Sequence, residues 1–235
     1  MNKRIVVTGG TRGIGKAILE RFAKENFDLI TCARNTKDLD ELKADLSTRY
    51  PGCNVIAHKA DVSNKAEVER FCAAVLKVHE TIDVLVNNAG FFIPGEITSE
   101  AEGALESMIE ANLYSAYYTT RGLVGGMQKV KRGHIFNICS IASFQAYPNG
   151  GSYAISKFAL LGFSKCLREE LKSSGIRVTA VLPGATLTSS WEGSGFPDER
   201  FIPAEDVAES VFNAWKLSPR SVVEEILIRP QLGDI

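Results

Sequence analysis

Apolar β-type segments alternate with helical segments along the chain, and this alternation limits the possible fold more than any other feature. The predicted strands are residues 4–8, 27–32, 54–58, 82–87, 134–139, 176–182 and 222–228. The predicted helices are residues 13–25, 37–50, 63–79, 99–129, 151–173 and 204–216. Most of the strands are continuously apolar, as expected for strands that are covered on both faces of a parallel sheet.

This order of elements predicts an α/β fold, a single doubly wound Rossmann domain. We expect a seven-stranded, mostly parallel sheet with helices on both faces. The chain has 235 residues, 45% of them hydrophobic, which is enough for one sizeable core. No repeat, low-complexity tract or long linker divides the sequence. Residues 1–235 are therefore expected to form one domain that carries both the cofactor and the substrate sites.

Charge and cysteine content argue against several kinds of partner. The formal net charge of -1 gives no basis for binding nucleic acid or a membrane surface. No apolar run approaches the ~20 residues of a membrane span, and the first predicted strand begins too early to leave room for a signal peptide. The five cysteines are scattered without a pairing pattern, and the three histidines lack metal-ligand spacing. We therefore expect a cytoplasmic protein without a metal site.

A glycine-rich loop, Thr8–Gly15, joins the first predicted strand to the first predicted helix. Glycines let the backbone turn tightly and approach a ligand, and a helix N-terminus offers free N–H groups to a pyrophosphate. The spacing is Gly-x3-Gly-x-Gly, not the Gly-x-Gly-x-x-Gly of the familiar dinucleotide fingerprint. A tight turn without a ligand is the alternative. The cofactor residues predicted in this loop are Gly9, Thr11, Arg12, Gly13, Ile14 and Gly15.

The end of the second predicted strand indicates which dinucleotide to expect. A carboxylate there binds the free 2′-hydroxyl of NAD, whereas a cation accommodates the 2′-phosphate of NADP. The strand is followed by Arg34 and Asn35, with no acid before Asp38. Arg34 can bind a phosphate through two parallel hydrogen bonds, and Arg12 supplies a second cation. We predict NADP(H); the alternative is that both arginines are merely solvated.

A hydroxyl, a phenol and an ammonium are expected to meet after the fifth predicted strand. Ser140 follows this strand, and Tyr153 and Lys157 lie at i and i+4 near the start of the next helix, on one face. A phenol titrates near pH ~10 in water, and a neighbouring cation lowers that pKa. The pair therefore suits acid–base chemistry, while Ser140 can donate a hydrogen bond to a substrate oxygen. Chance spacing on an amphipathic helix is the alternative.

Together these motifs resemble those of the short-chain dehydrogenase/reductase family over nearly the whole chain. Thr8–Gly15 matches the family's Thr-Gly-x3-Gly-x-Gly loop, and Tyr153 and Lys157 match its Tyr-x3-Lys pair, with Ser140 as the catalytic serine. The further matches, in chain order, are Asp61 and Val62, the run Asn87-Asn88-Ala89-Gly90, Asn112, Pro183 and Gly184, and Thr188.

The resemblance implies a role for each residue. Tyr153 is expected to be the general acid in carbonyl reduction and the base in the reverse reaction. Lys157 is expected to lower the tyrosine pKa and hold the nicotinamide ribose, Ser140 to orient the substrate oxygen, and Asn112 to hold a water that links Lys157 to solvent. The implied cofactor ligands outside the glycine loop are Arg34, Asn35, Asp61, Val62, Asn88, Ala89, Gly90, Tyr153, Lys157, Pro183, Gly184 and Thr188.

The helix predicted over residues 151–173 is apolar nearly all round in its middle. A helix lying on a sheet needs only one apolar stripe, so the second apolar face indicates a covered surface. The resemblance implies that this helix and the helix of residues 99–129 pair across a two-fold axis. We therefore expect a homodimer or homotetramer.

The substrate is the least readable part of the sequence. Trp191, Phe196 and Phe201 lie on a glycine-containing segment, 186–203, which suits a flat or apolar substrate, although ordinary packing explains them as well. The resemblance implies either a 3-oxoacyl thioester, as in the 3-oxoacyl-carrier-protein reductases, or a pteridine side-chain ketone, as in bacterial sepiapterin-reductase-like members. The second possibility gives Asp234 a role in binding the pteridine. A non-catalytic dinucleotide-binding sensor or scaffold of the same fold is the alternative function.

Overall fold

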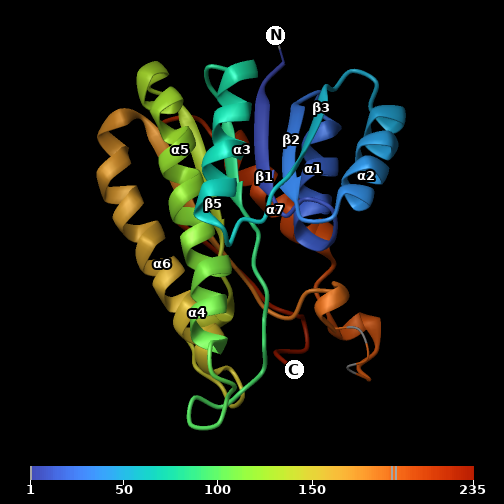
Figure 1. The fold of residues 1–235 in the computed structure, drawn as a ribbon, viewed down its shortest axis with the longest axis vertical. Coiled ribbons are helices and arrows are strands. Elements are labelled where there is room, and N and C mark those ends of the chain that lie inside the picture. Colours follow the sequence, from blue (N-terminus) through green and yellow to red (C-terminus); the bar gives the residue numbers. More distant parts are fainter. Residues whose placement is uncertain (1, 192, 194) are drawn as a thin grey trace.

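Seven strands form one sheet in the order β3-β2-β1-β4-β5-β6-β7, and every pairing is parallel (Figure 1). This computed structural model describes residues 2–191, 193 and 195–235. The strands are β1 (Arg4–Thr8), β2 (Asp28–Ala33), β3 (Val55–Lys59), β4 (Val84–Asn87), β5 (Gly133–Ile138), β6 (Ile176–Pro183) and β7 (Glu225–Ile228). The predicted Rossmann fold is confirmed, with a sheet that is wholly rather than mostly parallel.

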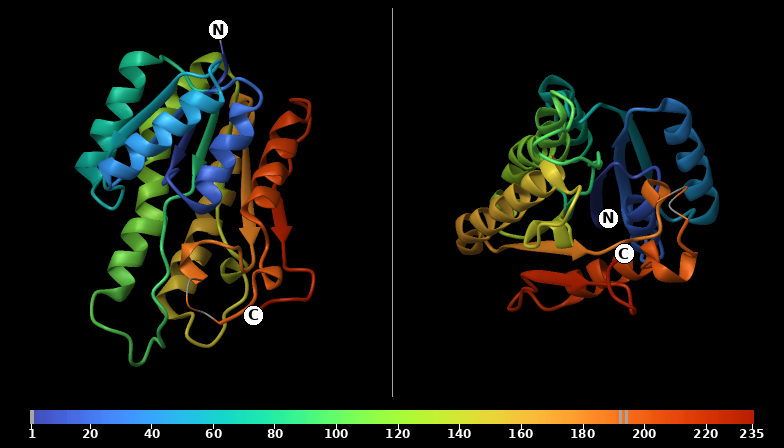
Figure 2. Two further views of the ribbon diagram at one scale, coloured as in Figure 1. Left: turned by 90° about the vertical axis from the view of Figure 1, so that its right-hand side faces the viewer. Right: turned by 90° about the horizontal axis from the view of Figure 1, so that it is seen from below.

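Helices cover both faces of the sheet (Figure 2). They are α1 (Gly13–Ala23), α2 (Thr36–Arg49), α3 (Lys65–Val78), α4 (Ala104–Ile109), α5 (Ser115–Val130), α6 (Gly151–Leu171) and α7 (Ala204–Lys216). Alternate β1 residues point to opposite faces: Ile5 packs with the core residues of α1, α2 and α7, and Val6 with those of α3, α5 and α6. Strands buried on both faces in this way need the continuous apolar runs seen in the sequence.

The long helix predicted over residues 99–129 is wrong at its start and interrupted in its middle. The chain is not helical before Ala104, because Gly103 precedes it with a left-handed backbone (φ 84°). A π-helical turn, Glu110–Tyr114, separates α4 from α5. Asn112 lies in this turn, and such turns often occur at functional sites.

Among the remaining boundaries, the starts of α3 and β7 differ from the predictions by two and three residues. Asn64, not Ser63, caps α3: its side chain accepts a hydrogen bond from the Glu67 N–H, while Ser63 bonds to Asp61 instead. The seventh strand was expected over 222–228 but starts at Glu225, where its pairing with β6 begins opposite Ala180. Both differences reflect contacts that periodicity does not encode.

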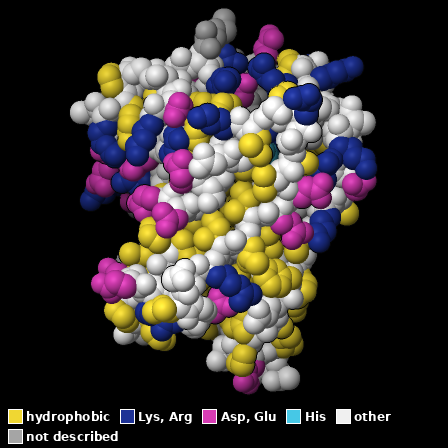
Figure 3. Space-filling model, turned by 180° about the vertical axis from the view of Figure 1, so that it is seen from behind, with side chains coloured by type: hydrophobic (Ala, Val, Ile, Leu, Met, Phe, Trp, Pro, Cys, Tyr) yellow, Lys and Arg dark blue, Asp and Glu magenta, His cyan; other side chains and the backbone are white. Residues whose placement is uncertain are grey.

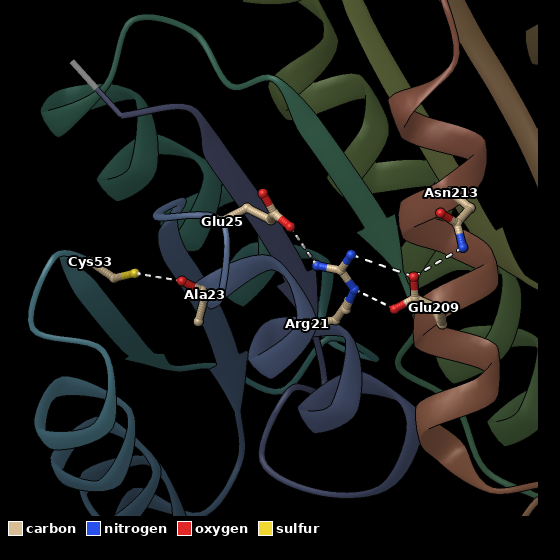
Figure 4. Close-up of polar contacts among 6 residues, drawn as sticks. All are labelled: Arg21, Ala23, Glu25, Cys53, Glu209 and Asn213. Atoms are coloured by element: carbon tan, nitrogen blue, oxygen red, sulfur yellow. Dashed lines mark hydrogen bonds and ion pairs between the residues drawn. The ribbon is translucent and has the colours of Figure 1, made fainter.

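The first and last helices are joined by a charged contact on the surface. Arg21 of α1 pairs with Glu209 of α7 and donates to Glu25 at 3.2 Å, and Asn213 donates to Glu209 at 3.0 Å (Figure 4). Beneath it, Phe22 makes edge-on contacts with Phe212 and Trp215 of α7. Helix α7 is thus packed and hydrogen-bonded against α1, the helix that follows the glycine loop.

Within the described part of the chain, no helix is long and apolar enough to span a membrane. The same residues contain no cluster of histidine, cysteine and acidic side chains suited to a metal ion. All five cysteines are free thiols.

Candidate active site

A cavity of about 880 Å³ lies at the carboxyl ends of the strands, where ligands bind in open α/β sheets. Its lining includes every residue that the sequence pointed to for catalysis or cofactor binding, with two exceptions, Gly15 and Asn112. The segments that form it follow β1, β2, β3, β4, β5 and β6 in turn. Residues far apart in sequence therefore share one hollow because parallel strands end at the same edge.

The glycine loop is shaped by its lack of side chains. Gly9 and Gly13 have positive φ angles of 69° and 53°. A Cβ on Gly15 would lie 2.4 Å from the Gly9 carbonyl oxygen, so Gly15 closes the turn against the loop itself rather than facing the cavity. The loop is thus held in a conformation that larger residues do not adopt without strain.

Asn88 ties the glycine loop to the end of β4. Its side-chain amide donates to the carbonyl oxygens of Thr8 at 2.9 Å and Gly9 at 3.0 Å. The Thr8 hydroxyl in turn accepts from the backbone N–H groups of Asn88 at 3.0 Å and Ala89 at 3.1 Å. The Asn88 amide thus positions the loop.

Ser140, Tyr153 and Lys157 are brought together at one wall of the cavity. A hydrogen bond joins Ser140 and the Tyr153 phenol. The Lys157 ammonium lies 5.6 Å from the centroid of the Tyr153 ring and donates to the Ile138 carbonyl oxygen at 2.9 Å. The Ser140 hydroxyl also accepts from the Ala142 N–H at 3.1 Å, which orients it at the end of β5.

Burial controls the ionisation of this group. It raises the pKa of the Tyr153 phenol, and the hydrogen bond from Ser140 only partly opposes this effect. Burial also lowers the pKa of the Lys157 ammonium to about 8. The net shift of the phenol pKa is therefore upward, because desolvation outweighs the hydrogen bond; the expected lowering of that pKa by Lys157 stays a prediction. The raised pKa favours the neutral phenol, which is the form that can donate a proton.

Asn112 does not face the cavity. Its side chain accepts from the Phe91 N–H at 2.9 Å and donates to the Phe91 carbonyl oxygen at 3.1 Å and to the Ser156 hydroxyl at 2.9 Å. Ser156 donates to the Tyr153 carbonyl oxygen at 2.7 Å. Asn112 thus connects the π-helical turn, the segment after β4 and helix α6; its expected role in holding a water stays a prediction.

The two arginines predicted to select NADP line the same cavity. Arg12 and Arg34 are both exposed, at the glycine loop and after β2 respectively. Asn35 caps α2 by accepting from the Lys37 N–H at 2.9 Å, so its side chain also organises the local backbone. Asp61 accepts from the hydroxyl of Ser63 at 2.7 Å. These residues fit a dinucleotide that carries an extra phosphate at the end of β2.

Comparison with known proteins supplies the family. A family model described as short chain dehydrogenase matches residues 3–195. The chain belongs to the short-chain dehydrogenase family. Among curated relatives, it is 32% identical to the sepiapterin reductase of Chlorobaculum tepidum, over 100% of this chain and 99% of that protein. It is 34% identical to the NADP-dependent 3-hydroxy acid dehydrogenase YdfG of Escherichia coli, over 94% of this chain and 86% of that protein.

Solved structures agree with this membership. The alcohol dehydrogenase of the archaeon Thermococcus sibiricus, complexed with 5-hydroxy-NADP, superposes with a TM-score of 0.92 at 29% identity. The match covers 98% of this chain and 97% of that one. As a member of the short-chain dehydrogenase family, the chain is an oxidoreductase.

In this short-chain dehydrogenase, the segment after Gly184 closes over the glycine loop. A Cβ on Gly13 would lie 3.0 Å from a methyl carbon of Thr188, as expected for a segment that covers the cofactor. The segment is anchored at its base, since Leu187 donates to Ile202 at 2.9 Å and Ile202 donates to Ala185 at 2.9 Å. Residues 192 and 194 of this segment lie outside the described residues.

Several residues of the substrate side were missed by the sequence analysis. Phe91 and Phe92, directly after the Asn-Asn-Ala-Gly run, line the cavity, and the Phe92 ring meets the Tyr153 ring edge-on at 4.9 Å between centroids. Gln145 also lines it. The signal in the sequence was position: Phe91 and Phe92 directly follow the Asn-Asn-Ala-Gly run, and Gln145 lies a few residues after Ser140. Trp191 and Asp234, which the sequence did suggest, are part of the same lining, as is Tyr147.

Proposed function

We propose that this chain is an NADP(H)-dependent oxidoreductase that reduces a ketone or aldehyde carbonyl to an alcohol and catalyses the reverse oxidation. The observation that carries the proposal is the presence of Ser140, Tyr153 and Lys157 in one cavity with the glycine loop. Arg12 and Arg34 in the same lining favour the phosphorylated dinucleotide. NADP also appears in the descriptions of the Escherichia coli relative and the Thermococcus sibiricus structure.

The residues of the cavity have complementary tasks in this proposal. When bound, NADPH supplies the hydride that adds to the carbonyl carbon. The neutral Tyr153 phenol donates its proton to the carbonyl oxygen, and Ser140 donates a hydrogen bond that orients that oxygen. Lys157 places a positive charge beside the phenol, which stabilises the phenolate left after proton transfer.

The cofactor would be held by groups from several strand ends. The glycine loop would receive the pyrophosphate through backbone N–H groups, Arg12 and Arg34 the 2′-phosphate, and Asp61 with Val62 the adenine. The nicotinamide half would be bound by Asn88, Ala89, Gly90, Tyr153, Lys157, Pro183, Gly184 and Thr188.

For the substrate, a flat, partly polar ketone is favoured over a small alcohol. Phe92, Tyr147 and Trp191 offer aromatic surface at the cavity, and Asp234 offers a carboxylate. A pteridine side-chain ketone uses both, in line with the relative described as a sepiapterin reductase. A 3-oxoacyl thioester uses the apolar surface and has no need of Asp234.

We also propose that the protein acts as a cytoplasmic homo-oligomer. Tyr114, Tyr117, Ile155 and Phe158 are exposed apolar residues on the π-helical turn, α5 and α6, the helices predicted to pair. A tetramer with dihedral symmetry needs a second interface on each chain. The face shown in Figure 3 carries a band of apolar side chains. Leu227 of the edge strand β7 is also an exposed apolar residue, with 54% of its surface accessible. Five free thiols suit a reducing compartment.

A panel of carbonyl compounds tests the proposed reaction. NADPH oxidation, followed by its absorbance, is expected with at least one ketone among a pteridine side-chain ketone, a 3-oxoacyl thioester, a diketone and simple ketones. NADPH binding without oxidation of any of them would favour a non-catalytic dinucleotide sensor. Light scattering at micromolar concentration tests the oligomer, and a monomeric mass would refute it.

A further inference from the structure

The catalytic helix α6 begins without a cap of its own. Gly150 stands at its N-cap and forms no side-chain hydrogen bond, and the first turn contains no acidic residue. The first N–H groups of a helix lack partners within the helix, and the helix dipole favours a negative charge at that end. Tyr153 lies in this uncapped first turn, so whatever caps the helix also acts on the position of the phenol.

Glu100 supplies the missing cap from a distant part of the chain. Its carboxylate accepts a hydrogen bond from the Ser152 hydroxyl and a longer one from the Ser152 N–H at 3.4 Å. Ser152 is 1% exposed, and Glu100 is half-buried. A carboxylate at this position satisfies orphan donors and complements the helix dipole at once.

Glycines on both sides of the contact let the segment that carries Glu100 lie close to the same helix turn. The Gly95 N–H donates to the Asn149 carbonyl oxygen at 3.0 Å, and Gly95 pairs with Gly150 in an isolated β-bridge. A Cβ on Gly151 would lie 2.5 Å from the Gly95 carbonyl oxygen and 2.9 Å from the Glu100 carboxylate. Only glycine at position 151 permits this approach.

The same segment also forms a wall of the substrate cavity. It runs from the end of β4 to the start of α4 and passes beside the start of α6 (Figure 1, Figure 2). Phe91 and Phe92 line the cavity at one end of it, and Phe92 contacts the Tyr153 ring. Glu100 anchors the other end to the residue next to Tyr153. Asn112 thus holds the Phe91 end of the segment to α6, and the Glu100 carboxylate holds its far end to the start of the same helix.

We propose that Glu100 is a positioning residue that anchors the segment of residues 91–103, whose Phe91 and Phe92 line the cavity, against the helix turn that carries Tyr153. It acts through Ser152 and does not touch the reacting atoms. The proposal rests on the function proposed above for its kinetic consequence, but the structural consequence stands independently. Without the carboxylate, the segment is expected to detach from the helix start, so that Phe92 no longer packs on Tyr153.

The test compares Glu100→Ala and Glu100→Gln with Glu102→Ala, an exposed acid of the same segment. In the NADPH-bound protein, Glu100→Ala is expected to raise KM for the carbonyl substrate by about tenfold, the typical effect of losing a charge-assisted hydrogen bond. The dissociation constant for NADPH should stay within about twofold of wild type, because the glycine loop and the two arginines proposed to hold its phosphates lie away from Glu100. Glu100→Gln, which keeps an acceptor but not the charge, should fall in between.

A second readout needs no turnover. Chymotrypsin should cleave at Phe91 and Phe92 about tenfold faster in Glu100→Ala than in Glu102→Ala, with the NADPH-bound protein otherwise resistant. If wild type reduces no carbonyl at all, the proposed function fails while this cleavage comparison still decides the role of Glu100. Equal cleavage in the two variants would overturn the proposal, as would an equal KM.

Glycine substitutions give an independent check. Gly151→Ala keeps Glu100 but forces the segment away, so it should reproduce the raised KM and faster cleavage. Gly162→Ala on the same helix is the matched control, since a Cβ there meets nothing within 4 Å. A Gly151→Ala protein that behaves like Gly162→Ala would contradict the proposed contact. Weakened NADPH binding and faster cleavage along the whole chain in Glu100→Ala would likewise overturn it, in favour of general destabilisation.

Discussion

The dinucleotide side and the substrate side of the cavity are built on different principles. The dinucleotide side consists of backbone turns at strand ends, where Gly9 and Gly15 shape one loop and Asn88 from the neighbouring strand holds it. The substrate side consists of segments tied together by side chains over long distances in sequence. Its ties include Glu100 with Ser152 and Arg229 with Gln145, at 3.0 Å. Arg229 also pairs locally with Asp234, at 2.8 Å.

This difference has a consequence for specificity. Backbone turns depend on a few glycines and leave little freedom to vary without loss of the fold. Side-chain ties between loops can be exchanged one at a time, so the reacting carbonyl can change while the cofactor site stays the same. Tyr153 and Lys157 lie where the two sides meet, which makes them the point at which the comparison can be tested most directly.

The largest effect is expected for Tyr153→Phe. The change removes the proton donor but keeps the ring that packs against Phe92. We expect kcat to fall by about 10²- to 10⁴-fold, the usual contribution of general acid catalysis, with the NADPH dissociation constant unchanged. Steady-state kinetics and fluorescence titration check it. Retained turnover would show that the Tyr153 phenol is not the proton donor.

Lys157 should make stability depend on pH. Its pKa is about 8 in the folded chain against an ordinary value of 10.5, so between these values the unfolded chain binds more protons and stability rises with pH. The gain is absent below about pH 8, where both states are protonated. The unfolding free energy of wild type relative to Lys157→Met should therefore increase by about 3 kcal/mol across this range. Denaturant titrations at pH 7.5 and 10.5 measure the unfolding free energies of both proteins. A difference between them that does not change with pH would contradict the lowered pKa of the buried Lys157 ammonium.

Gly15→Ala addresses the dinucleotide side alone. The new Cβ would lie 2.4 Å from the Gly9 carbonyl oxygen and 2.5 Å from the Asn88 amide nitrogen, so the loop must shift and its hydrogen bonds must weaken. NADPH affinity should fall by roughly 10- to 100-fold. Gly125→Ala, where nothing lies within 4 Å, is the control and should bind NADPH normally. Equal NADPH affinity in the Gly15→Ala and Gly125→Ala variants would show that the backbone shape of the glycine loop does not govern dinucleotide binding.

The smallest effect concerns the choice between dinucleotides. Arg34→Ala should raise KM for NADPH by about tenfold and leave KM for NADH unchanged, because the guanidinium is expected to meet only the 2′-phosphate. Lys37→Ala, a nearby exposed cation that pairs with Glu41 at 3.8 Å, should change neither. A wild-type KM for NADH equal to or below that for NADPH would refute NADP preference itself.

Much of the dinucleotide side could be predicted because its signals are local. Thr8–Gly15 lies between one strand and one helix, and Tyr153 and Lys157 are one helical turn apart, so spacing alone brings their side chains to one place. The start of α4 was missed because Gly103, not hydrophobic periodicity, ends the preceding segment. Glu100 was missed because its partner, Ser152, is 52 residues away and nothing in the local pattern links them.

The amino-acid sequence by itself determined the order of strands and helices, the glycine turn, and the presence of a serine, tyrosine and lysine where strand β5 and helix α6 meet. Periodicity and turn chemistry carry that information within a few residues. Only the tertiary structure decided that Asn112 and Asn88 hold backbone segments, that Glu100 caps helix α6, and that burial raises the pKa of the Tyr153 phenol. These hydrogen bonds and this pKa depend on burial and on which distant segments come into contact. Both are determined only once the chain has folded.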